Sequence, residues 1–190
     1  MRSLIRKLLR PSAKYSVLAL TGTGLVLGVA AVIGFEASMR ATNTEAFCTS
    51  CHEMAVNPSA QLQETSHFAN PSGVHATCAD CHVPKEFVPK MIRKIQASRE
   101  VWGHFTGIID TPEKYAAHAP VMKAREIARL RASDSRECRN CHSIDRMLPG
   151  SQTAKARQYH QAMERQGKTC IDCHSGIAHP RNIPGAVAGR

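Results

Sequence analysis

Cys48-Thr-Ser-Cys51-His52 is the first of four Cys-x-x-Cys-His motifs in this chain. The others are Cys78-Ala-Asp-Cys81-His82, Cys138-Arg-Asn-Cys141-His142 and Cys170-Ile-Asp-Cys173-His174, and together the four motifs use all 8 cysteines. Two thiols three residues apart on one turn can each form a thioether to a porphyrin vinyl group, and the next residue then presents an imidazole to the iron. The motifs therefore predict four covalently bound haem c groups.

Paired cysteines at this spacing also occur in zinc ribbons and in disulfide frameworks of exported domains. Neither type of site explains why a histidine follows each of the four pairs directly. A zinc site would take the thiolates and leave that histidine without a role, so the pattern favours haem over zinc.

The composition points to a chain that folds around its cofactors. After one hydrophobic span, roughly 150 of the 190 residues remain for a soluble part, which is enough for one domain. Only 5% of all residues are aromatic, which is little for a conventional core. Haem groups would supply the missing apolar bulk. We therefore expect a mainly α fold with much irregular structure and little β-structure.

The formal net charge of +10 would ordinarily suggest nucleic acid or anionic lipid as a partner. Each haem, however, brings two propionates, or about eight negative charges in all, only partly offset by the irons. Many of the lysines and arginines are then better explained as propionate partners. We expect no nucleic-acid partner.

Residues 16–35, SVLALTGTGLVLGVAAVIGF, carry no charge and are long enough to cross a membrane as a helix. The basic residues before this span are Arg2, Arg6, Lys7, Arg10 and Lys14, and no acidic residue precedes it. This distribution predicts a cytoplasmic N-terminus. We expect a basic tip and anchor over residues 1–36 and a periplasmic haem domain over 37–190, in the inner (cytoplasmic) membrane of a bacterium.

A cleaved secretory signal is the competing interpretation, because it shares the basic start and the apolar stretch. The span is long for a signal peptide, and Phe35-Glu36-Ala37-Ser38 makes a weak cleavage site, so we favour an uncleaved anchor. Gly24 and Gly28 have the small-xxx-small spacing that seats a second membrane helix, which leaves a homo-oligomer open.

The motifs fall into two pairs, which predicts two dihaem halves at about 45–105 and 133–180. Between them, apolar residues at helical spacing predict an amphipathic helix over 86–104. Asp110-Thr111-Pro112-Glu113 is typical of a helix start, and this helix should run to Arg131. A third helix is expected over 152–166, with Ser151 as its cap and Gly167 as its stop. The Pro- and Gly-containing tail from His179 should be extended.

Several segments together resemble the NapC/NirT/NrfH family of membrane-anchored multihaem quinol dehydrogenases. They are the N-terminal anchor, the first motif with its following Glu53-Met54, the run HFANPSGVHATCADCH from His67 to His82, the connector PKEFVPKMIRKIQASREVWG, and the segments ECRNCHS and CIDCHSGIAH. The last two segments look more like the NapC branch than the NrfH branch.

The resemblance implies a quinol dehydrogenase that relays electrons from membrane quinol, either menaquinol or ubiquinol, to a periplasmic nitrate reductase. Two alternatives stay open. One is an NrfH-like donor and anchor subunit of a nitrite reductase, and the other is a passive electron-transfer module that never oxidises quinol. A terminal reductase is not expected, because the chain has no room for a molybdenum-cofactor domain or a dedicated substrate pocket.

Distal iron ligands must come from outside the motifs, because low-spin haems take a second strong axial ligand. The histidines outside the motifs are His67, His75, His104, His118, His160 and His179. The resemblance implies that His179 completes the third haem with His142, and that His67 completes the fourth with His174. His160 is the alternative distal ligand for either haem.

The resemblance implies two less usual ligands for the first two haems. Met54 would bind the first haem in place of the motif histidine, with His52 as the alternative. Lys94 would pair with His82 on the second haem, with His104 as its alternative. A lysine amine binds iron only when it is deprotonated, so burial would have to lower its pKa.

Cys48 follows the apolar span by about a dozen residues, which predicts that the first haem lies near the membrane surface. Quinol oxidation releases two protons as well as two electrons, so a site here needs a proton acceptor. Lys94 and Glu100, on the same predicted helix, are the candidate quinol-site residues, with Glu100 as proton acceptor. An ion pair of Glu100 with Arg93 is the alternative role for this glutamate.

Overall fold

The computed structural model describes residues 14–163 and 165–180. The chain divides into two compact units between Thr42 and Asn43. The basic residues of the predicted cytoplasmic tip, apart from Lys14, and the tail beyond Pro180 lie outside the described residues.

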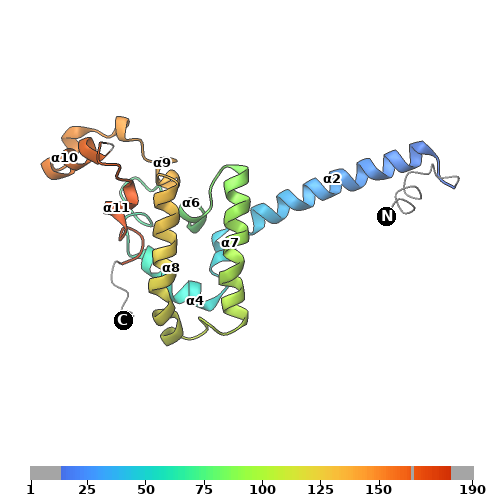
Figure 1. The fold of residues 1–190 in the computed structure, drawn as a ribbon, viewed down its shortest axis with the longest axis horizontal. Helices are drawn as coiled ribbons and strands as arrows, with labels where there is room; N and C mark the ends of the chain where they lie inside the picture. Colours follow the sequence, from blue (N-terminus) through green and yellow to red (C-terminus); the bar gives the residue numbers. More distant parts are fainter. Residues whose placement is uncertain (1–13, 164, 181–190) are drawn as a thin grey trace. The chain divides into compact units, whose positions relative to one another are not determined.

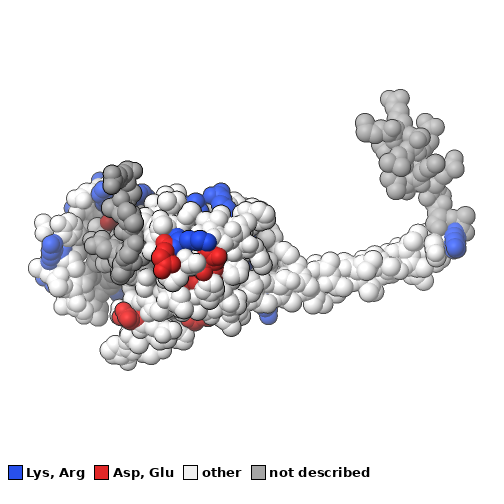
Figure 2. All heavy atoms as spheres, turned by 90° about the horizontal axis from the view of Figure 1, so that it is seen from below, with Lys and Arg blue, Asp and Glu red and all other residues white. Residues whose placement is uncertain are grey.

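The first unit contains one long helix, α2 (Val17–Ala41). Its most apolar window has a mean hydropathy of 2.2, and none of its side chains is buried within the structure. Ser16 caps the helix by accepting a hydrogen bond from the Ala19 amide at 3.2 Å. Figure 2 shows α2 without charged side chains over most of its length. This helix is long and apolar enough to cross a membrane.

Helix α2 continues past the apolar span to Ala41. On its last turns, Glu36 and Arg40 form an i,i+4 ion pair at 3.2 Å, which supports this extension. The predicted boundary after residue 36 marks the end of the membrane anchor, and it stays a prediction. Among the described residues, no side chain and no backbone from outside the helix lies within 4 Å of a Cβ built on Gly24 or Gly28, so this part of the chain leaves both positions open.

The second unit is helical, and the described residues contain no strand, which confirms a mainly α fold with irregular connections. Figure 1 shows its two longest helices, α7 and α8, side by side with the short helices around them. The helices in chain order are α3 (Glu45–Cys48), α4 (His52–Met54), a π-helical turn (Ala55–Ser59), α5 (Ala60–Gln63), α6 (Cys78–His82), α7 (Phe87–Phe105), α8 (Pro112–Ala132), α9 (Arg136–Arg139), two 3-10 turns (Ile144–Arg146 and Pro149–Ser151), α10 (Ala154–Met163) and α11 (Cys170–His174). The division into dihaem halves stays a prediction.

The two long helices agree with the sequence prediction to within one residue at each end. Helix α8 begins as expected, because the Thr111 side chain accepts a hydrogen bond from the Lys114 amide at 3.3 Å and Pro112 occupies the first turn. Helix α8 ends at Ala132, and two residues later Asp134 and Ser135 adopt positive φ angles of 52° and 51°. That left-handed backbone cannot continue a right-handed helix.

The predicted start of the third helix was wrong. Helix α10 begins at Ala154, and its first turn is capped by Thr153, whose side chain accepts from the Ala156 amide at 3.1 Å. Ser151 instead belongs to a preceding 3-10 turn. After the helix, Gly167 takes the expected left-handed conformation, with φ of 59°. The amide of Lys168 then bonds back to the Met163 carbonyl at 2.9 Å.

The protein supplies only a small apolar core of its own. Among the described residues, the buried apolar side chains are Leu62, Ile109, Ala119, Leu130, Met163 and Ile171. Four polar residues are buried with them, and two of these, Glu53 and Ser135, are the most fully enclosed. Such sparse packing agrees with a domain whose interior is completed by cofactors.

Ser135 joins the third and fourth haem-binding segments. It is fully buried, and its hydroxyl accepts a hydrogen bond from the Ile171 amide at 3.1 Å. Ile171 lies between the two cysteines of the fourth motif, and Ser135 lies three residues before Cys138 of the third. This bond spans 36 residues of chain and fixes one motif against the other.

Replacing Ser135 with alanine should therefore lower the stability of the haem domain. The change leaves the buried Ile171 amide without its partner, which costs about 1–3 kcal/mol. The measurement is the free energy of unfolding of the haem-loaded protein in denaturant. Ser151→Ala, at an exposed serine, is the control and should change it by less than about 0.5 kcal/mol. Equal stability of the two variants would contradict this role of Ser135.

Candidate functional site

Each Cys-x-x-Cys-His motif begins on or beside a short helix. The second and fourth motifs form α6 and α11, and each is started by a capping box in which a threonine and an aspartate bond to each other's backbone amides. These pairs are Thr77 with Asp80 and Thr169 with Asp172. The two motifs thus share the local sequence Thr-Cys-x-Asp-Cys-His and the same start.

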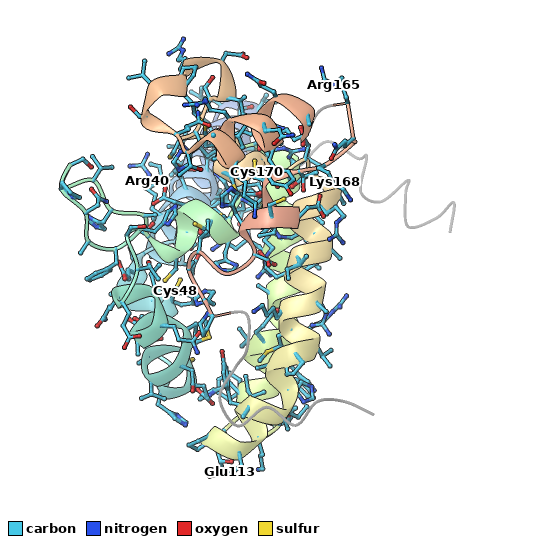
Figure 3. The ribbon with its side chains drawn as sticks, turned by 90° about the vertical axis from the view of Figure 1, so that its left-hand side faces the viewer. Arg40, Cys48, Glu113, Arg165, Lys168 and Cys170 are labelled. Carbon is cyan, nitrogen blue, oxygen red and sulfur yellow. The ribbon has the colours of Figure 1, made fainter. Side chains whose placement is uncertain are left out.

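The motifs lie next to one another in the second unit. Helix α3 packs against α6, α6 against α9, and α11 against α8. Figure 3 shows Cys170 towards one end of α8 and Glu113 at the other end. The ion pair between Arg131 and Asp172, at 2.7 Å, ties α11 to the last turn of α8. All eight cysteines lie in the described residues, and none forms a disulfide.

Each of the four motif histidines faces a histidine from outside the motifs. Two imidazoles that share one iron, each with a nitrogen about 2 Å from the metal, have ring centroids about 6 Å apart. The structure shows this spacing in four pairs, which are His52–His104 at 6.2 Å, His67–His142 at 6.1 Å, His82–His179 at 6.2 Å and His160–His174 at 6.1 Å. The side chains present therefore fit haem iron with two axial imidazoles.

The arrangement of these rings differs from the expected pairing. His179 faces His82 of the second motif, where the sequence analysis placed it on the third haem. His67 faces His142 of the third motif, where it was expected on the fourth. His160, expected only as an alternative, faces His174. The pairs of His67 and His179 join residues far apart in the chain, so local spacing carries no information about them.

The protonation of these side chains also suits metal binding. Burial lowers the pKa of His179 to about 4, and burial also lowers the pKa of His67, so both rings are neutral near pH 7. The neutral ring is the form that binds a metal. His160 donates its Nδ1 hydrogen to Gln152 Oε1 at 2.8 Å, which leaves Nε2 as the metal-binding nitrogen.

The first motif has the same ring spacing, between His52 and His104, but differs in its hydrogen bonds. His52 Nε2 donates to the carbonyl oxygen of Asp110 at 2.9 Å, and a protonated nitrogen has no lone pair for iron. Met54 instead lines a cavity with Cys48 of its own motif and with residues of the second motif. This geometry favours Met54 over His52 as the axial ligand of the first haem.

Glu53, between His52 and Met54, is a residue that the sequence analysis missed. Its side chain is only 2% exposed, and its Oε1 accepts from His104 Nδ1 at 2.7 Å. Burial opposes ionisation, but the hydrogen bond from His104 holds the pKa of this carboxyl below its ordinary value. His104 is thereby held beside the first motif, although it was expected as an alternative ligand of the second haem. Its position directly after the motif histidine His52 was the sequence feature that could have marked Glu53 as a site residue.

Lys94 and Glu100 occupy different surroundings on α7. Lys94 is half-buried and within electrostatic reach of Cys48, and burial, followed by the charges of Lys90 and Arg93, lowers the pKa of its ammonium group. Glu100 Oε2 is buried and lies 4.0 Å from Arg93 Nη1, which is the alternative role considered for it. Arg93 thus acts on both side chains.

The outer side of α7 is unusually apolar for a solvent-facing helix. Its large exposed side chains include Ile95, Trp102 and Phe105, which are 73%, 67% and 78% exposed. On the domain face drawn in Figure 2, by contrast, basic and acidic side chains lie next to one another. The charge of the chain is therefore not gathered into one basic patch on that face.

The NapC/NirT cytochrome c family, N-terminal region, matches residues 10–184. The denitrification system component NirT of Stutzerimonas stutzeri is 49% identical over 93% of this chain and 88% of its own length. The cytochrome c-type protein NapC of Escherichia coli K12 is 47% identical over 93% and 90%, and the TorC protein of the same strain is 39% identical over 94% and 46%. No solved structure matches the chain.

The histidine pairs can be tested by removing His160. Because His160 faces His174, His160→Ala should leave one haem without a second imidazole and convert it from low spin to high spin. Electron paramagnetic resonance of the oxidised protein measures this change. The control is His118→Ala, at an exposed histidine of α8, which should keep every low-spin signal. An unchanged spectrum for His160→Ala would instead favour the pairing of His174 with His67.

Proposed function

The chain belongs to the NapC/NirT cytochrome c family, and from this we propose that it oxidises membrane quinol and passes the electrons to a periplasmic reductase. Membership makes it a membrane-anchored electron-transfer protein with covalently bound haem c. That the haems number four, one for each motif, is part of the proposal. Bound haem supplies one-electron redox chemistry.

The proposed axial ligands follow the ring geometry. His82 and His179 hold the second haem, His142 and His67 the third, and His174 and His160 the fourth. The spacing of about 6 Å in all three pairs supports these assignments. Two of the pairs, His82 with His179 and His142 with His67, join a motif to a distant segment, so these ligands also fix the fold of the domain.

Met54 is the proposed axial ligand of the first haem. The bond between His52 and the Asp110 carbonyl supports this, because it occupies the nitrogen that would otherwise bind iron. With a single protein ligand, the opposite side of the first haem would remain open to a substrate.

Lys94 carries the proposed quinol site, and the burial that lowers the pKa of its ammonium group is the observation that most supports it. Quinol oxidation requires the loss of two protons, and a lysine with a lowered pKa can accept one. The exposed apolar side chains of α7 also suit a lipid-soluble substrate. Glu100 is the proposed second acceptor, acting from beside Arg93.

The proposed orientation has the N-terminus in the cytoplasm and the haem domain in the periplasm, in a bacterial inner membrane. Protons from the quinol would then be released on the side where the electrons leave, so the protein alone would build no proton gradient. Either menaquinol or ubiquinol fits this chemistry.

We propose periplasmic nitrate reductase as the electron acceptor. The identity of 47% with NapC supports this choice, but the identity of 49% with NirT is equally high. An NrfH-like donor and anchor subunit of a nitrite reductase, the alternative considered from the sequence, is the second candidate. Quinol-dependent turnover of each purified reductase in the presence of this protein would separate the two.

Quinol oxidation predicts a specific effect of replacing Lys94. Lys94→Gln removes the proton acceptor beside the first motif, so reduction by a menaquinol analogue should slow by about 100-fold or more. The measurement is anaerobic stopped-flow absorbance of the oxidised protein in detergent, following the α-band of ferrous haem c. Lys85→Gln, an exposed lysine just before α7, makes the same change in charge and should react at the wild-type rate.

Reduction by dithionite separates a lost quinol site from a damaged haem domain. Lys94→Gln should be reduced by dithionite as fully as the wild-type protein. If the wild-type protein is reduced by dithionite but not by quinol, the dehydrogenase proposal fails and a passive relay with an upstream protein donor replaces it.

A further inference from the structure

The motif histidine of the second haem-binding segment has a carboxylate partner from a distant helix. His82 Nδ1 donates a hydrogen bond to Glu126 Oε1 at 3.0 Å, across 44 residues of chain. Glu126 lies on α8 and is 21% exposed, while His82 ends α6. This bond occupies Nδ1 and leaves Nε2 for the iron, so it sets the orientation of the ring.

Arg129, one turn further along α8, holds that carboxylate in place. Its Nε lies 3.0 Å from Glu126 Oε1 and 3.1 Å from Oε2, and its Nη2 lies 2.7 Å from Oε1. The arginine is only 17% exposed, so this ion pair is poorly screened by solvent. Glu126 therefore cannot turn away from His82 without breaking its contacts with Arg129.

The same guanidinium reaches both the second and the third motif. Its Nη2 donates to the carbonyl of Cys81 at 3.2 Å, and its Nη1 lies 2.7 Å from Glu137 Oε1. Glu137 immediately precedes Cys138, and its side chain is 1% exposed. Because α6 packs directly against α9, this arginine lies where the second and third motifs meet.

We propose that Glu126 and Arg129 are positioning residues that tune the second haem through His82 and fix the second motif against the third. A carboxylate that accepts the Nδ1 hydrogen makes the imidazole a stronger electron donor, which favours ferric iron and lowers the reduction potential. Arg129 keeps the carboxylate aligned and neutralises part of the buried charge of Glu126 and Glu137. This inference rests on the proposed ligation of haem by His82.

The test is a potentiometric titration of the purified full-length protein, with the haem absorbance followed at each potential. Glu126→Gln keeps the size of the side chain but weakens the acceptor, so one midpoint potential should rise while the other three stay in place. Glu126→Asp, which keeps the charge at a greater distance, should give a smaller rise. Glu113→Gln, at an exposed glutamate of the same helix, makes the same change in charge without facing a histidine.

Arg129→Gln tests the second part of the proposal, with Arg125→Gln, at an exposed arginine on the same helix, as its control. Loss of Arg129 should move the same haem as Glu126→Gln and also lower the unfolding temperature, whereas the control should do neither. Where Arg129→Gln fails to take up haem, Arg129→Lys keeps the charge but not the forked contacts and serves in its place.

Unchanged midpoint potentials in Glu126→Gln would overturn the proposal. An equal rise in Glu113→Gln would also overturn it, because the effect would then be one of net charge. Electron paramagnetic resonance of a further variant, His82→Ala, tests the assignment of His82 as a haem ligand independently of the midpoint potentials. Low-spin signals that persist in His82→Ala would show that His82 is not a ligand, and failure would then lie with the proposed ligation.

Discussion

The spread of four Cys-x-x-Cys-His motifs along a chain with little apolar core is the constraint on which this structure depends. Six apolar side chains are buried among the described residues, too few to hold a domain of this length together by packing alone. The polypeptide instead uses local caps, ion pairs and, in the proposed ligation, histidine pairs that share an iron. The order of the second unit is thus inseparable from its cofactors, as in other domains that fold around bound metals.

Two kinds of interaction position the motifs, and they act over different ranges. The capping boxes of Thr77 and Thr169 are local, because each threonine and its aspartate lie three residues apart. They fix the start of a motif but not its place in the domain. Buried contacts across the chain supply that place, including Ser135 with Ile171 and Arg129 with Glu137. Substitutions in these buried long-range contacts should disturb the spacing between haems.

This difference in range explains which features the sequence predicted. Helices α7 and α8 were placed to within one residue because their boundaries depend on local signals such as Thr111 and Pro112. The start of α10 was misplaced because Ser151 and Thr153 are both good caps, and only the backbone selects between them. The facing of His67 with His142 was beyond the sequence, since it joins residues 75 positions apart with no local pattern to mark it.

Glu100, a proposed proton acceptor, and Glu126, the partner of His82, both lie near Arg93. This shared neighbour links the proposal on α7 to the proposal on α8. Arg93 lies 4.0 Å from Glu100 and also 4.0 Å from Glu126. A change at Glu100 therefore alters the charge around Arg93 and, through it, the carboxylate that orients His82. The charge of Arg93 also acts on Lys94. Slower quinol oxidation after a change at either Glu100 or Lys94 would thus have two possible origins, the loss of a proton acceptor and a shift of the carboxylate that orients His82.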